Sequence, residues 1–266
     1  MLQVSRSGFY DWRKREPADW ERQVLQDLVR DIHEGKRGRI GSRRMAKELQ
    51  RRGYQIGRLQ ARSLMREAGV ECRQRRRFKA TTDSNHGRPV APNLLERQFN
   101  VVEPDRIWVA DITTIWTREG WEYLAAILDL ADRQVVGWAM ADHMRTGLAT
   151  SALDMALGRR QPEAGLIHHS DRGSQYAANE FQQMLADKGV RQSMSRKGDC
   201  WDNAVMERFF GTLKSEWTDA RQYATREEAR RDVIHFIEME YNSQRPHTTL
   251  GYQSPREREW ELADVS

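Results

Sequence analysis

Apolar side chains recur at helical spacing through the first 70 residues. The pattern predicts a helix across residues 24–32, a glycine-rich break at 35–41, a second helix over 43–51 and a third over 58–68. Ser42 is expected to cap the second helix. The side chains expected to face inward are Met45, Ala46, Leu49, Leu59, Leu64 and Met65. Two short helices around a turn that contains glycine fit a helix-turn-helix.

The pattern changes after residue 105. Apolar segments at 107–116, 121–130 and 135–140 predict an antiparallel three-stranded meander, with Trp108, Trp121 and Trp138 in its core. The elements expected next are a helix at 146–157, a strand at 165–171, a helix at 179–188 and a strand at 191–194. Strands followed by alternating helices and strands describe an α/β fold, a mixed sheet with helices on its faces.

Two further helices are expected near the C-terminus. One runs over 202–217, with Asp202 as its cap and an apolar stripe formed by Met206, Phe210, Leu213 and Trp217. The other runs over 226–241 and leads to a turn that contains His247. The chain is therefore expected to divide into a basic helical region at 1–70, a basic linker at 71–104 and an α/β region at 105–266.

Charge is distributed unevenly between these regions. The net charge is +5 over the whole chain, but residues 1–100 carry +12 and residues 101–266 carry −7. A basic arm beside an acidic body favours binding of a polyanion by one part and different chemistry in the other. The phosphate contacts expected in the arm come from Arg43, Arg44, Lys47, Arg75, Arg76 and Arg77. A solvated surface is the alternative for the same side chains.

Composition excludes several classes of protein. The mean hydropathy is −0.85, and no apolar stretch of about 18 residues is present, which argues against a membrane span. The N-terminus lacks an apolar signal core, and the two isolated cysteines provide neither a disulfide framework nor a zinc site. We therefore expect a cytoplasmic protein, associated with the bacterial nucleoid if it binds DNA.

Three acidic residues are candidates for metal chemistry. Asp111 lies inside a predicted buried strand, Asp171 ends the next one, and Glu207 lies beside the apolar stripe of a helix. Each alone has a structural explanation: a paired core carboxylate, a turn aspartate or an exposed helix glutamate. If the three converge, each pair at about 4 Å costs roughly 4 kcal/mol at an effective dielectric of about 20, and a divalent cation removes that cost. Oxygen ligands select Mg²⁺ or Mn²⁺, and two such ions can activate a water or a 3′-hydroxyl towards a phosphodiester.

Several motifs together resemble one family. They are Asp111-Ile112-Thr113, the segment from His168 to Tyr176, and the segment from Asp202 to Lys214, with 35 residues between Asp171 and Glu207. The segments 193–198 and 241–247 and the basic N-terminal part also match. This set resembles the DDE transposases of insertion sequences, namely the second-frame (OrfB) protein of the IS-three family, which is related to retroviral integrases. Arg208 departs from the pattern, since the family more often has a small polar residue there.

The resemblance implies a ribonuclease-H-like core with a mixed five-stranded sheet. Asp111, Asp171 and Glu207 would be the catalytic, metal-binding triad for Mg²⁺ or Mn²⁺, with two ions. The reaction would be hydrolytic release of a 3′-hydroxyl at the element end, followed by direct strand transfer to another DNA phosphate. The implied partners are element-end and target DNA, further copies of the chain, and an upstream-frame protein.

Several basic residues and histidines are expected to support the three acids, and two other functions are possible for the same sequence. Arg196 and Lys197 are expected in a loop that contacts DNA near the cut, and Lys214 is placed to meet a phosphate. His168 and His169 point to opposite faces of a strand, which favours structural roles. The role of His247 stays open. The alternatives to a transposase are a non-catalytic DNA-binding regulator and a ribonuclease-H-type nuclease that uses only water as nucleophile.

Overall fold

The computed structural model describes residues 6–72, 90–96, 98–196 and 203–265. The chain forms two compact units, Met1–Arg76 and Arg77–Ser266, and each is described by itself. No helix in these ranges is both long and apolar enough to cross a membrane. Residues 73–89 and 97 of the predicted linker lie outside the described residues.

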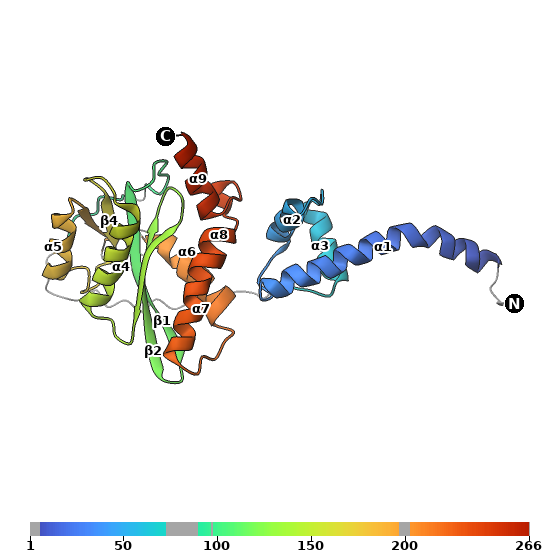
Figure 1. Ribbon diagram of the computed structural model, residues 1–266, viewed down its shortest axis with the longest axis horizontal. Helices are drawn as coiled ribbons and strands as arrows, with labels where there is room; N and C mark the ends of the chain where they lie inside the picture. Colours follow the sequence, from blue (N-terminus) through green and yellow to red (C-terminus); the bar gives the residue numbers. More distant parts are fainter. Residues whose placement is uncertain (1–5, 73–89, 97, 197–202, 266) are drawn as a thin grey trace. The chain divides into compact units, whose positions relative to one another are not determined.

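Three helices make up the described part of the N-terminal unit, residues 6–72 (Figure 1). They are α1 (Arg6–Gly35), α2 (Ser42–Arg51) and α3 (Arg58–Glu67). Met45, Ala46, Leu49, Leu64 and Met65 are buried in their shared core, as predicted. Leu59 is 78% exposed, so its prediction was wrong, and Ala61 of the same helix is buried instead. Ser42 begins α2, but the N-cap is Gly41, which provides no side-chain bond.

The second unit is built on a mixed five-stranded sheet, as predicted. Its strands are β1 (Ile107–Thr117), β2 (Gly120–Asp129), β3 (Val135–Ala141), β4 (Ile167–Ser170) and β5 (Arg191–Met194). Their order is β3-β2-β1-β4-β5. The meander β1–β2–β3 is antiparallel, whereas β4 runs parallel to β1 and β5 parallel to β4. The central strand β1 therefore carries an antiparallel neighbour on one side and a parallel one on the other.

Helices cover both faces of this sheet (Figure 1). One core lies under α4 (Thr146–Arg160) and α5 (Asn179–Asp187). The other lies under α6 (Ala204–Leu213), the π-helical turn η2 (Lys214–Thr218), α7 (Arg226–His235) and the second π-helical turn η3 (Phe236–Tyr241). The predicted stripe of Met206, Phe210, Leu213 and Trp217 is buried in this second core. The predicted cap Asp202 lies outside the described residues.

Two of the three tryptophans expected in the core are at least half-buried. Trp108 is fully buried and Trp138 is half-buried, but Trp121 is 47% exposed, so that prediction was wrong. The register of β1 and β2 pairs Trp121 with Trp116, one step from the Thr117–Gly120 pair that closes the hairpin. Both rings lie at the end of the hairpin, where neither apolar core includes them.

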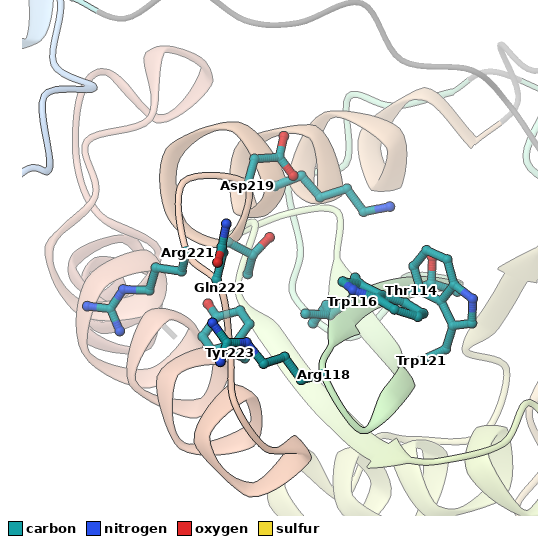
Figure 2. A pocket seen from close by; sticks show the side chains of 11 residues that line it. Thr114, Trp116, Arg118, Trp121, Asp219, Arg221, Gln222 and Tyr223 are labelled. Atoms are coloured by element: carbon teal, nitrogen blue, oxygen red, sulfur yellow. The ribbon is translucent and has the colours of Figure 1, made fainter.

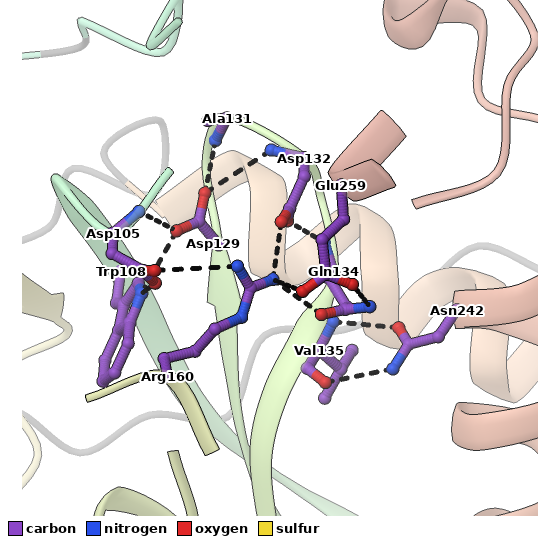
Figure 3. Close-up of polar contacts among 10 residues, drawn as sticks. All are labelled: Asp105, Trp108, Asp129, Ala131, Asp132, Gln134, Val135, Arg160, Asn242 and Glu259. Atoms are coloured by element: carbon purple, nitrogen blue, oxygen red, sulfur yellow. Dashed lines mark hydrogen bonds and ion pairs between the residues drawn. The ribbon is translucent and has the colours of Figure 1, made fainter. Parts of the chain in front are cut away.

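A polar cluster attaches the last helices to the sheet (Figure 3). Arg160 pairs with the buried Asp132 and lies 3.6 Å from Asp105 and 3.4 Å from Glu259. Glu259 belongs to α9 (Pro255–Val265), which the sequence pattern did not predict. We call Arg160 with Asp105, Asp129, Asp132 and Glu259 the Arg160 cluster.

Asn242 makes a second attachment (Figure 3). It begins the short helix α8 (Asn242–Gln244), which the single turn η4 (Thr248–Leu250) follows. Its side chain accepts from the backbone N–H of Val135 at 2.9 Å and donates to the Val135 carbonyl at 3.0 Å. This pair of bonds satisfies the backbone where β3 begins and holds the C-terminal segment against it.

Candidate active site

The strand register places the first two acids side by side. β1 and β4 are parallel, and Ala110 pairs with Ser170. Asp111 follows Ala110 and Asp171 follows Ser170, so the two acids lie side by side on neighbouring segments of the chain. Paired strands are about 4.8 Å apart. Asp171 stands just beyond the carboxyl end of β4, where open α/β sheets place ligand sites.

Local hydrogen bonds orient both carboxylates. Asp111 Oδ1 accepts from the backbone N–H of Ile112 at 2.7 Å, and Asp171 Oδ1 accepts from that of Gly173 at 2.8 Å. A Cβ on Gly173 would come within 3.0 Å of Asp171 Oδ1 and 2.6 Å of Gln175 Oε1. Gly173 is therefore a supporting residue that sequence reasoning missed, although it lies within a motif that was noted.

Helix α6 brings the third acid to the same strand. Asn203, the N-cap residue of α6, donates from Nδ2 to the carbonyl oxygen of Ala110 at 3.4 Å. Glu207 follows four residues later, one helical turn and about 6 Å along the axis, on the same side of the helix as Asn203. The sequence did not reveal this bond from Asn203, which joins the start of α6 to the residue before Asp111.

The electrostatics agree with this convergence. Burial raises the pKa of Asp111 well above its usual range, and the charge of Asp171 adds to the rise, with a smaller addition from Glu207. The charge of Lys214 acts in the opposite direction on the pKa of Asp111. Burial also raises the pKa of Glu207. A carboxylate in such a place is stabilised by a cation more strongly than one in water.

The three acids do not form a closed ligand set in this conformation. Within residues 6–72, 90–96, 98–196 and 203–265, no three His, Cys, Asp or Glu side chains stand close enough to hold a metal ion. The Glu207 residue is exposed to solvent, whereas Asp111 and Asp171 are half-buried. The donor set, carboxylate oxygen alone, fits Mg²⁺ or Mn²⁺.

The two adjacent histidines are both fully buried. His168 is fully buried, its ring lies 5.3 Å from that of Phe181, and burial lowers its pKa to about 3. His169 bonds to the hydroxyl groups of Ser193 at 2.8 Å and Ser195 at 3.1 Å. His247 packs edge-on against the ring of Tyr241 at 4.9 Å.

The predicted DNA contacts have different surroundings. Arg43 and Arg196 are exposed, and Lys47 is half-buried. Arg44 is half-buried and donates to the carbonyl of Arg39, so its guanidinium is partly engaged within the protein. Lys214 lies in η2, and burial lowers its pKa. Arg75, Arg76, Arg77 and Lys197 lie outside the described residues.

Comparison with known proteins agrees with the fold. Residues 102–200 and 188–255 match two family models described as integrase core domain, and residues 19–78 match one described as HTH-like domain. A simian T-cell lymphotropic virus intasome, in complex with the PP2A regulatory subunit B56 gamma, contains a similar chain. That chain is 16% identical, with coverage of 90% of this chain and 73% of that one and a TM-score of 0.48.

Closer relatives come from insertion sequences. The insertion element IS600 uncharacterized 31 kDa protein of Shigella sonnei is 45% identical over 95% of this chain and 93% of that protein. Transposase InsF for insertion sequence IS3A of Escherichia coli strain K12 is 38% identical, over 97% of this chain and 91% of that one. These similarities extend across both structural units.

The fold and these matches define the class of protein as a polynucleotidyl transferase of the DDE type, with an integrase core and an HTH-like N-terminal region. Such a combination of domains implies DNA as the partner. The chain belongs to the IS3 family of insertion-sequence transposases. The expected family, fold and enzyme class are therefore confirmed.

Proposed function

We propose that Asp111, Asp171 and Glu207 are the catalytic acids of this transposase and that they bind two divalent cations, Mg²⁺ or Mn²⁺. The observation that carries the proposal is the pair of contacts that converge on Ala110. Ala110 pairs in register with Ser170, the residue before Asp171. The carbonyl oxygen of Ala110 accepts from Asn203, which lies one helical turn before Glu207. Bound ions would activate the attacking hydroxyl and stabilise the leaving oxygen of the phosphodiester.

The residues of the chain have separate tasks in this reaction. Asp111 and Asp171 occupy fixed positions, because each is oriented by a backbone N–H. Glu207 is the exposed member of the set, and rotation of its side chain towards Asp111 would complete it. Lys214 lies two turns beyond Glu207 and carries the positive charge that a DNA phosphate would contact.

The DNA path beyond the acids is also proposed. Arg43, Arg44 and Lys47 of α2 would contact phosphates of element-end DNA, as would Arg75, Arg76 and Arg77 in the segment that follows, while Arg196 and Lys197 would contact DNA near the cut. Basic side chains on a helix-turn-helix support this assignment. Each phosphate neutralised should lower log K by about 0.9 per tenfold rise in salt. Binding that does not change with salt would contradict it.

The proposed function extends to assembly and location. Strand transfer joins two DNA ends, which favours a multimer, and the family resemblance favours a fusion to, or complex with, an upstream-frame protein. A DNA-bound enzyme of this kind would work at the nucleoid. The regions 1–70, 71–104 and 105–266 are proposed as arm, linker and catalytic core.

Incubation with labelled element-end DNA and Mg²⁺ tests the function. Wild-type protein, alone and fused to its upstream frame, should release a 3′-hydroxyl and then form strand-transfer products. Hydrolysis without strand transfer would instead indicate a ribonuclease-H-type nuclease. Binding without any cleavage, by either form, would leave only the DNA-binding regulator.

A further inference from the structure

A pocket opens beside the end of the β1–β2 hairpin (Figure 2). Its volume is about 740 Å³, and its walls come from β1, the start of β2, η2 and the segment that follows η2. Trp116 and Trp121 form one side, and Arg221, Gln222 and Tyr223 form the other. None of the candidate acids lines it, so the pocket is a feature separate from the acids themselves.

The two indoles are unusually exposed for their size. Trp116 is 58% exposed and Trp121 is 47% exposed, and their ring centroids lie 4.8 Å apart in an edge-on arrangement. They face one another across the β1–β2 register. A cross-strand aromatic pair that leaves about half of each residue in water stabilises the hairpin less than a buried pair would. The exposed indole surface is available to a flat, apolar partner.

Positive charge surrounds the same pocket. Arg118, Arg221 and Lys214 line it, against the single carboxylate of Asp219. Arg221 is paired with Asp232 at 2.9 Å. Arg118 makes no ion pair with any residue in the described part of the chain, and its position between the indoles and Tyr223 is visible in Figure 2. A flat aromatic partner that carries negative charge matches these walls.

The pocket shares Lys214 with the surroundings of the candidate acids. Lys214 lines the pocket, and its charge also acts on Asp111. Trp116 lies five residues after Asp111 on β1, which is about 17 Å at the rise of a β-strand. A DNA strand advances about 3.4 Å per nucleotide in a duplex, so this distance corresponds to five nucleotides or fewer.

We infer that this pocket binds an unpaired base of the DNA strand, within about five nucleotides of the phosphate held by the catalytic acids. The base stacks on the indoles of Trp116 and Trp121, and Arg118 contacts a phosphate beside it. An unpaired base can present its flat face to the indoles, whereas inside a duplex both faces of each base are stacked on neighbouring bases. The inference rests on the proposed function for the position of the base relative to the phosphate held by the catalytic acids.

Binding of tailed DNA to the full chain tests the inference without any cleavage. The probes are fluorescein-labelled 20-base-pair duplexes of mixed sequence, each with a five-nucleotide 3′ tail, in EDTA. One tail carries normal bases, and the other carries abasic units with the same phosphates. Stacking on an aromatic side chain is worth about 1–3 kcal/mol per base, so wild-type protein should bind the normal tail about tenfold more tightly by fluorescence anisotropy.

Substitutions then show which residues cause the tighter binding of the tail with normal bases, called here the base preference. The double variant Trp116→Ala/Trp121→Ala should lose it, and Trp116→Phe/Trp121→Phe should retain most of it. Trp260→Ala is the matched control, because Trp260 is 61% exposed on α9 and does not line the pocket. Arg118→Ala should weaken binding of both tails equally. A 5-iodouracil in the tail should form photoadducts on Trp116 or Trp121 of the wild-type protein, which requires no variant.

The contradicting results are equally specific. Equal affinity of wild-type protein for the two tails would overturn the inference, as would photoadducts confined to other regions. A double variant that keeps the base preference but changes the sedimentation coefficient would show a surface for another protein copy instead. Asp111→Asn should keep the base preference, so loss of cleavage and loss of base binding are distinguishable.

Discussion

Two groups of carboxylates lie in the same catalytic unit, and they are neutralised in different ways. In the Arg160 cluster, Arg160 itself supplies the positive charge, and Asp129 accepts from the backbone N–H groups of Asp105 and Ala131. Around Asp111, burial and the neighbouring charges of Asp171 and Glu207 raise the pKa, against the backbone N–H of Ile112 and the charge of the half-buried Lys214. Arg160 supplies a counter-charge from within its own cluster, whereas the acids around Asp111 leave a place for an external cation.

The largest expected effect is on catalysis at the uncompensated group. Asp111→Asn, Asp171→Asn and Glu207→Gln should each reduce DNA cleavage about a thousandfold or more, because each removes a ligand of a cation that supplies several kcal/mol of transition-state stabilisation. DNA affinity in EDTA should stay the same. Cleavage assays on labelled element ends measure the effect, and full activity in any one of the three would break the comparison.

The Arg160 cluster should show the reverse: little effect on chemistry and a large one on stability. Arg160→Met leaves the fully buried Asp132 without its charge partner and should lower the free energy of unfolding by about 3–5 kcal/mol. Arg159→Met is the matched control, because Arg159 is 42% exposed and its pair with Glu238 contributes less than about 1 kcal/mol. Equal losses in urea unfolding would show that the cluster does not hold the C-terminal helices.

Acid sensitivity should come from His168 rather than from either group of acids. Its pKa falls to about 3 in the folded chain against about 6.5 unfolded, so stability is lost as the pH drops below 6.5. At pH 5 the loss should be about 2 kcal/mol. His168→Phe should remove it, since the ring neighbours are Phe181 and Tyr176. If wild-type protein and His168→Phe lose the same free energy of unfolding between neutral pH and pH 5, this assignment is contradicted.

The smallest expected effect is a change in melting temperature that has opposite signs for the two groups of acids. Asp111→Asn should raise the melting temperature by about 2–4 °C without added metal, because it removes a charge that lacks full compensation. Asp132→Asn should lower it, because Arg160 loses its partner. Calorimetry of the two variants measures the difference.

The gain from Asp111→Asn should also depend on pH. The folded pKa of Asp111 is raised, so the folded chain binds more protons than the unfolded chain below that pKa, and wild-type stability rises on acidification. The gain should therefore shrink as the pH falls towards 4. A gain that is constant with pH would show that the pKa of Asp111 is the same in the folded and unfolded chains.

Much of this organisation could be predicted from sequence, and the remainder has physical reasons. The strands β1 to β3 follow their apolar runs, β4 and β5 lie where short strands were predicted, and the stripe from Met206 to Trp217 identified the buried face of its helix. Trp121 was wrongly placed in the core, because a strand pattern does not show where the covering helices end. Leu59 was also wrong: it lies in the first turn of α3 and is exposed, whereas Leu64 of the same helix is buried.

The candidate site was predictable as residue types but not as contacts. The spacing of Asp171 and Glu207 was visible in the chain, whereas the bond from Asn203 to Ala110 depends on tertiary packing between α6 and β1. The Arg160 cluster was not predicted at all, because its members come from segments up to 154 residues apart, Asp105 to Glu259. Polar pairs at such separation leave no periodic signal.

Direct measurement of Mn²⁺ binding tests the central claim most closely. Isothermal titration calorimetry and electron paramagnetic resonance of the full chain should show Mn²⁺ bound by wild-type protein, with affinity reduced by at least tenfold in both Asp111→Asn and Glu207→Gln. Asp132→Asn should bind like wild type. If Glu207→Gln binds Mn²⁺ as tightly as wild type while Asp111→Asn does not, the acid on α6 is not a ligand, and the three-carboxylate site is contradicted.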